Sequence, residues 1–153
     1  MHMAQNDVGG DLNEMAQNFG LEFGKDWTCP GNFQPSTGVE IDVLNKLYNI
    51  SDCLLTCTLG EGFGLTILDG LVTKTPVVAP ANTCLPEVLS DNKAFLVPAG
   101  ETTSAWIMKE MDNERIRPLM NVELAADAIE RIIEGEIIFI SICIWHRMML
   151  GAI

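Results

Sequence analysis

The segment Gly60–Asp69, with the sequence GEGFGLTILD, marks the point where a strand turns into a helix. The apolar segment Cys53–Cys57 precedes it and is typical of a buried strand. After the turn, Leu65–Thr73 carries apolar residues at helical spacing on one face, which predicts an amphipathic helix. The glycines therefore lie at the junction, where they let the backbone bend sharply and approach a ligand closely.

The start of this predicted helix is a candidate phosphate site. First-turn N–H groups have no partner within a helix and carry a partial positive charge. Two carboxylates bracket the site, Glu61 before the turn and Asp69 two helical turns later. Carboxylates repel phosphate, so their expected partners are hydroxyl groups of a sugar or a ribose. The combination suggests a nucleotide sugar, although a purely structural glycine-rich turn explains the pattern equally well on physical grounds alone.

Further motifs follow the glycine-rich turn in order. Glu61–Leu65 with Asp69 is followed by Thr75–Val78 (TPVV) and Pro86–Val88 (PEV). These motifs resemble the C-terminal, donor-binding half of GT-B-fold retaining glycosyltransferases of the large group 1, or family 4, type. That family includes sucrose synthases and bacterial mannosyltransferases. Its signature is Glu-x7-Glu, and the second acid is an aspartate here.

The resemblance extends between Gly10 and Glu134 and implies an α/β fold. The expected architecture is a partial Rossmann-like, doubly wound parallel sheet, half of a GT-B fold. The first two strands of that half and the whole N-terminal acceptor domain are expected to be missing, so the domain is truncated at its N-terminal side. Residues 1–134 are expected to form the truncated nucleotide-sugar-binding domain, and residues 135–153 an apolar C-terminal tail.

The resemblance also implies roles for the residues of the turn. The diphosphate would be held by the backbone amides of Gly62, Phe63, Gly64 and Leu65, together with Thr66. Glu61 would be the catalytic residue and touch the sugar's hydroxyls, while Asp69 would contact the ribose. Aspartate is one methylene shorter than glutamate, which leaves the ribose contact short unless a water bridges it.

No metal and no cofactor other than the nucleotide-sugar substrate is expected. The resembled fold stabilises the leaving diphosphate with helix dipoles and basic side chains. The Arg and Lys that usually do so have no matching motif here, because neither Lys25 nor Lys46 stands in one. Pro86 and Glu87 are implied near the donor pocket, but a helix start explains them equally well.

Other segments are assigned from local patterns. Trp27–Cys29 is a short strand candidate, and the turn-rich Pro30–Gly38 is expected at the carboxyl end of the sheet. There Phe33 would approach the base, although a surface-loop aromatic is an equal alternative. Pro76–Ala79 and Ala94–Val97 predict further strands, and 100–120 has no clean periodicity, which suggests an insertion.

Three helices are expected outside the turn region. The first is capped by Asp11 with Glu14, ends at Gly20 and buries one face, formed by Leu12, Met15, Ala16 and Phe19. The second runs from Asp42 to Tyr48. The third is capped by Asn121, ends at Gly135 and has an expected buried side of Val122, Ala125, Ala126, Ile129, Ile132 and Ile133. A further short helix is expected at Leu85–Leu89. The position before the TPVV motif is Lys74, where related sequences have glycine as a left-handed helix cap.

Composition limits the expected partners and the expected cellular compartment. The net charge of −12 argues against nucleic acid and anionic membranes as partners, since both need a basic surface. The first residues lack the apolar core of a signal peptide, and the five cysteines show no paired zinc spacing. Buried free thiols in a reducing cytoplasm are therefore expected.

The function expected from these features is donor binding in glycosyl transfer. The chain would bind a nucleotide-diphosphate sugar and act as a hexosyltransferase-like enzyme only with an acceptor domain on another chain. The alternatives are a non-catalytic nucleotide-sugar-binding or interaction module, and an inactive truncated fragment. The tail segment Ile137–Trp145 predicts a strand buried on both faces, which would join the sheet or pair the chain with a second copy.

Overall fold

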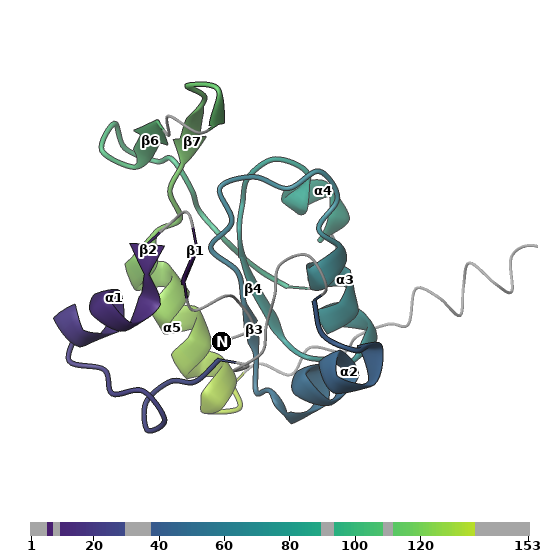
Figure 1. The fold of residues 1–153 in the computed structure, drawn as a ribbon. Helices are drawn as coiled ribbons and strands as arrows, with labels where there is room; N and C mark the ends of the chain where they lie inside the picture. The colour runs from purple at the N-terminus through teal and green to yellow at the C-terminus, as the bar shows by residue number, and fades with distance from the viewer. Residues whose placement is uncertain (1–5, 8–9, 30–37, 90–93, 109–111, 137–153) are drawn as a thin grey trace, which may run out of the picture. The chain divides into compact units, whose positions relative to one another are not determined.

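The computed structural model describes residues 6–7, 10–29, 38–89, 94–108 and 112–136 (Figure 1). The chain divides into two compact units, Met1–Leu44 and Asn45–Ile153. Two parts of the sequence prediction lie outside the described residues, the turn-rich segment 30–37 with Phe33 and the tail from residue 137 onward. No helix within the described ranges has both the length and the apolar character that crossing a bilayer requires.

The first unit contains a short hairpin and a helix. Strands β1 (Asn6–Asp7) and β2 (Gly10–Asp11) pair antiparallel and lead into α1 (Leu12–Asn18). Asp11 caps α1 as predicted, and its carboxylate accepts a hydrogen bond from the Asn13 amide at 2.8 Å. The prediction that α1 buries an apolar face is wrong, because no residue of the helix is buried.

The predicted strand at Trp27–Cys29 is also absent from this unit. Trp27 forms only an isolated bridge with Phe23. The chain turns back at Gly24, whose φ is +83° and whose amide donates to the Trp27 carbonyl at 2.7 Å. The two aromatic rings then meet edge to face, with centroids 5.0 Å apart. A local turn has therefore replaced the strand.

The second unit is built on a parallel sheet of the order β3-β4-β5. The strands are β3 (Leu54–Leu55), β4 (Val77–Pro80) and β5 (Phe95–Val97). Leu54 lies opposite Val77, and Val78 lies opposite Phe95. This parallel pairing confirms the predicted α/β class and the predicted parallel sheet. All of β4 is buried, since the apolar run VVAP is flanked on both sides.

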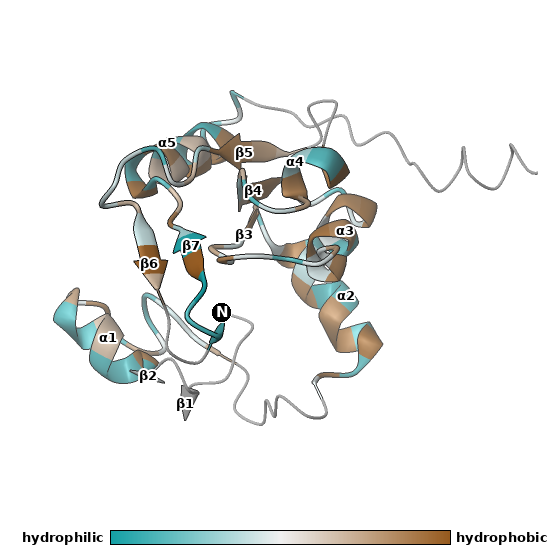
Figure 2. Cartoon of the chain, turned by 90° about the horizontal axis from the view of Figure 1, so that it is seen from above, coloured by the Kyte–Doolittle hydropathy of each residue, from teal (hydrophilic) through white to brown (hydrophobic). Residues whose placement is uncertain are grey.

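Helices cover both faces of this sheet (Figures 1 and 2). Side chains alternate along β4, so Val77 and Ala79 face α3 (Leu65–Val72) and α4 (Leu85–Val88), where they pack with Ile67 and Leu85. Val78 faces the other way and packs with Val97 and three residues of α5 (Val122–Ile133), which are Ala125, Ala128 and Ile132. The sheet is therefore doubly covered, consistent with a partial Rossmann-like glycosyltransferase domain.

Strand β3 is shorter and more exposed than the sequence predicts. It comprises only two of the five residues of Cys53–Cys57, and Leu55 is 43% exposed. Among the described strands, β4 is its sole neighbour, so β3 lies at an edge. The apolar composition of the segment predicts that both faces are buried. It does not show whether a second strand pairs with the other edge of β3.

The helix ends agree with the sequence better than the helix faces do. The Asn121 side chain caps α5 by accepting from the Leu124 amide at 3.1 Å, as predicted. Val122, Ala126 and Ile133, predicted to be buried, are exposed, because only a narrow face of α5, formed by Ala125, Ala128 and Ile132, meets the sheet. Past α3, Lys74 has a φ of +64°, so the left-handed cap forms without glycine. Helix α2 (Ile41–Ile50) extends slightly beyond its predicted range.

The stretch 100–120, predicted to be irregular, contains a hairpin. Strands β6 (Trp106–Met108) and β7 (Ile116–Pro118) pair antiparallel, and an Ala99–Met120 bridge closes the base. The indole N–H of Trp106 donates to the Gly100 carbonyl at 3.0 Å. All three residues of β6 are exposed, so its strand carries no alternating pattern that the sequence could show.

Candidate functional site

The turn between β3 and α3 is shaped by Gly64. Gly64 is the N-cap of α3, with φ +80° and ψ +52° in the left-handed region, and its carbonyl accepts from the Ile67 and Leu68 amides, each at 3.1 Å. A Cβ at this position would lie 3.2 Å from Ile67 Cδ1 and 3.2 Å from Leu85 Cδ2. Both the backbone angle and the packing therefore favour glycine at this position.

The first amides of α3 are available to a ligand. Leu65 and Thr66 open the helix, and no acceptor among the described residues takes a hydrogen bond from their N–H groups. The turn is open to solvent, since Phe63 is 56% and Leu65 is 70% exposed. These N–H groups lie at the positive end of the helix dipole, which favours the binding of an anion there.

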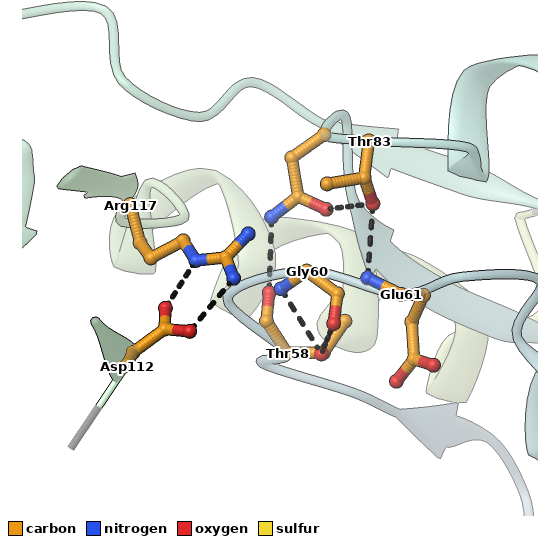
Figure 3. Close-up of polar contacts among 7 residues, drawn as sticks. Thr58, Gly60, Glu61, Thr83, Asp112 and Arg117 are labelled. Carbon is orange, nitrogen blue, oxygen red and sulfur yellow. Dashed lines mark hydrogen bonds and ion pairs between the residues drawn. The ribbon is translucent and has the colours of Figure 1, made fainter. Parts of the chain in front are cut away.

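Glu61 is fixed through its backbone and leaves its carboxylate free to reach a ligand. Its amide donates to Thr83 Oγ1 at 3.0 Å. One residue earlier, the Gly60 amide donates to Thr58 Oγ1 at 3.3 Å. Figure 3 shows the Glu61 carboxylate pointing away from Arg117. The loop is thus held on two sides while its acidic side chain stays outside these contacts.

Two residues that the sequence prediction missed support this loop from the end of β4. Asn82 is only 6% exposed, and its Nδ2 donates to the Thr58 carbonyl at 3.0 Å. Thr83 has a φ of +45°, and its hydroxyl donates to Asn82 Oδ1 at 3.3 Å. Non-glycine residues in this strained region often lie at functional sites. Their position just past the carboxyl end of a buried strand was the available signal.

Asp69 lies one turn into α3, whose start at Leu65 agrees with the prediction. Only the residues from Leu65 onward are helical, so the spacing from Glu61 is not two helical turns. Asp69 is exposed. Burial, and then the nearby Asp69 charge, raise the pKa of Tyr48 above its usual value. The Tyr48 hydroxyl donates to the Thr66 carbonyl at 2.9 Å, which braces the first turn of α3 from α2.

Arg117 is the third missed residue, and it brings positive charge to the loop. It lies on β7, and its Nη1 would be 2.9 Å from a Cβ added at Gly60. Its Nε and Nη2 donate to the two carboxylate oxygens of Asp112, at 2.5 and 3.0 Å (Figure 3). The hydrogen bonds from Arg117 to Asp112 raise the pKa of Arg117. The aperiodic sequence around β7 gave no sign that this residue returns to the turn.

The predicted site residues therefore gather on one continuous feature. Glu61, Gly62, Phe63, Gly64, Leu65 and Thr66 form the turn and the helix start, and Asp69 follows on the next turn of the helix. Pro86 and Glu87 lie on α4, whose Leu85 packs beneath Gly64. Within the described ranges, no cluster of three or more His, Cys, Asp or Glu side chains could hold a metal ion.

The chain belongs to the glycosyl transferases group 1 family, whose sequence model matches residues 24–111. The chain is 31% identical over 86 residues to a D-inositol 3-phosphate glycosyltransferase of Actinosynnema mirum. That alignment covers 56% of this chain and 20% of the relative, so the chain spans about a fifth of that relative's length. No solved structure matches the chain.

Proposed function

We propose that the β3–α3 turn binds the diphosphate of a nucleotide sugar, as the donor-binding part of a retaining GT-B glycosyltransferase. The observation that carries this proposal is the left-handed Gly64 cap, which presents the acceptor-free Leu65 and Thr66 amides at an exposed helix start. Membership of the group 1 family supports it, because that family transfers sugars. Helix starts of this kind bind phosphate through their N–H groups and dipole.

Each residue of the turn has a role in this proposal. The amides of Gly62, Phe63, Gly64 and Leu65, together with Thr66, hold the diphosphate. Glu61 accepts hydrogen bonds from the sugar's hydroxyls at the reacting face, and the Thr83 contact to its amide fixes where that side chain begins. Asp69 accepts from the ribose, directly or through a water. The binding residues thus lie in the order of the ligand's parts along the turn and helix.

Transfer itself also needs an acceptor, which a second domain would hold. This chain therefore has a donor-binding role, and we expect catalysis only when such a domain is supplied, in the same protein or on another chain. The thiols of Cys53, Cys57 and Cys84 are free, which fits a reducing compartment, the cytoplasm, but the prediction that they are buried is wrong, since Cys57 is exposed and the other two are half-buried. The alternative is a nucleotide-sugar binder without catalysis. An activity assay with an added acceptor domain separates the two, because only the donor-binding part of an enzyme would then transfer the sugar.

The test is an NMR titration of the isotopically labelled chain with UDP, GDP and ADP, followed by their hexose conjugates. We expect the largest amide shifts at Gly62–Thr66. Changes confined to other parts of the chain, or no binding to any of the six ligands, would contradict the proposal.

A pair of variants tests the role of Glu61. Glu61→Ala should weaken the sugar nucleotide about 10- to 100-fold more than the bare nucleotide, which is the range for a hydrogen bond to a charged group. Glu130→Ala removes the same charge from the exposed side of α5 and should change neither affinity. Equal loss of both ligands in Glu61→Ala would refute the assignment to the sugar.

A further inference from the structure

We propose that Arg117 supplies the positive charge for a phosphate-bearing ligand at the Gly60–Gly64 turn. This inference rests on the proposed function, because it assigns a further residue to the same ligand. It adds what the sequence prediction could not find, a basic side chain at the turn. The residue comes from the β6–β7 hairpin rather than from the strand and helix that form the turn.

The guanidinium is anchored along one edge and open along the other. Nε and Nη2 donate to Asp112, and no acceptor among the described residues takes a hydrogen bond from Nη1. Nη1 is the atom that faces Gly60. Because the guanidinium is a planar fork of donors, fixing one edge also fixes the direction of the other. The free edge therefore lies beside the turn before a ligand binds, so that binding costs no further conformational entropy of this side chain.

Gly60 makes this approach possible. Any side chain there would place its Cβ 2.9 Å from Nη1, which is closer than a carbon and a nitrogen can pack. Unlike Gly64, Gly60 has no positive φ that would require glycine. A side chain at position 60 would therefore displace the guanidinium from its place beside the turn, and its Cβ would also lie 3.2 Å from Thr83 Cγ2. The Arg117 side chain keeps 23% of its surface exposed, so a ligand can reach it.

The positive charge of Arg117 matters because both the protein as a whole and the proposed ligand are negatively charged. The protein carries a net charge of −12, and a nucleoside diphosphate is also an anion, so the average field opposes binding. The Arg117 guanidinium places one positive charge beside the turn. Asp112 offsets part of that charge, and the Glu61 carboxylate points away from the guanidinium (Figure 3). The ligand's phosphate would share Arg117 with Asp112.

The competing explanation is that Arg117 is a purely structural clamp. The two explanations predict changes of opposite sign in nucleotide affinity for the Asp112→Asn variant. If Arg117 only holds the hairpin to the loop, removing either partner of the Arg117–Asp112 pair should disturb the turn and weaken nucleotide binding to the same extent. If Arg117 binds phosphate, Arg117→Gln removes the attraction, whereas Asp112→Asn removes a competing negative charge. The first variant should then weaken binding and the second should strengthen it.

The experiment is calorimetric titration with whichever of UDP, GDP and ADP binds the wild-type chain most tightly, at two salt concentrations. We expect Arg117→Gln to weaken binding about 10- to 100-fold and to reduce its salt dependence. Asp112→Asn should bind the nucleotide more tightly than the wild type, because it removes the competing negative charge. Arg115→Gln is the matched control, since it removes the same charge from an exposed position on the same hairpin, and it should change affinity less than about twofold.

The outcomes separate this inference from the proposed function. Failure of the wild-type chain to bind any of the three nucleotides overturns both. Normal binding by Arg117→Gln, or equal weakening by Arg117→Gln and Asp112→Asn, overturns only the role of Arg117. Urea unfolding of each variant shows whether it folds. If Arg117→Gln does not fold, the sign of the Asp112→Asn effect decides, with tighter binding supporting the inference and unchanged or weaker binding refuting it.

Discussion

Replacement of Gly64 by alanine should destabilise the second unit strongly. A left-handed backbone at a non-glycine residue costs about 1–2 kcal/mol. The new Cβ would also lie 3.2 Å from two side chains, Ile67 and Leu85, which are both 0% exposed and have no solvent to move into. Overpacking of that kind adds about 1–3 kcal/mol. The two effects together predict a loss of about 2–5 kcal/mol, a large share of the roughly 5–15 kcal/mol that stabilises a typical domain.

The neighbouring Gly62 provides the matched control. Its backbone lies outside the left-handed range, and an added Cβ would meet nothing within 4 Å. Gly62→Ala should therefore be neutral or stabilise by about 0.4–1 kcal/mol through the unfolded chain. Urea unfolding followed by circular dichroism measures both variants, and Gly64→Ala should lower the midpoint by roughly 1–2.5 M for an m-value of about 2 kcal/mol/M. Midpoints that agree between the two variants would refute the argument from backbone angle and packing.

Three further outcomes are expected. Lys74→Gly should stabilise the chain by about 1 kcal/mol, because Lys74 holds a φ of +64° that glycine adopts freely, whereas Lys74→Ala should not. Tyr48 is the single tyrosine, so phenolate absorbance should report a pKa above about 10 in the folded chain. Since that pKa is raised on folding, its contribution to stability should be complete below the unfolded pKa and be lost as the pH rises through the folded one; a folded pKa equal to that in urea would contradict this. Deleting residues 136–153 should lower the melting temperature or change the oligomeric state, because β3 has an open edge in the described sheet, and an unchanged melting temperature and elution volume would disprove it.

The sequence predicted the parts of the fold that are set by neighbours in the chain. The buried run at Val77–Ala79, the cap at Asn121 and the glycine turn before α3 all depend on local propensity or on a local pattern. Glu61–Thr66 form one continuous segment at the predicted helix start, and their role in binding stays a prediction. Local rules were sufficient wherever the partners are only a few residues apart.

Prediction failed where the environment comes from distant parts of the chain. Nothing local shows how narrow the face of α5 that meets the sheet is, so Val122, Ala126 and Ile133 were wrongly assigned to its buried side. Nothing local shows that Arg117 returns to Gly60, because the β6 strand that pairs with β7 has no buried face to impose alternation. Asn82 and Thr83 were detectable in principle, since they follow a strand that the sequence did predict.

The close approach of Arg117 to Gly60 also restricts how this protein can diverge. A side chain at position 60 would push the Arg117 guanidinium aside and would also press on the Thr83 methyl group, 3.2 Å from the added Cβ. Two positions far apart in the sequence are thus coupled through one contact. Loss of the hairpin would remove the Arg117 contact, whereas the Thr83 contact and the left-handed backbone of Gly64 would remain.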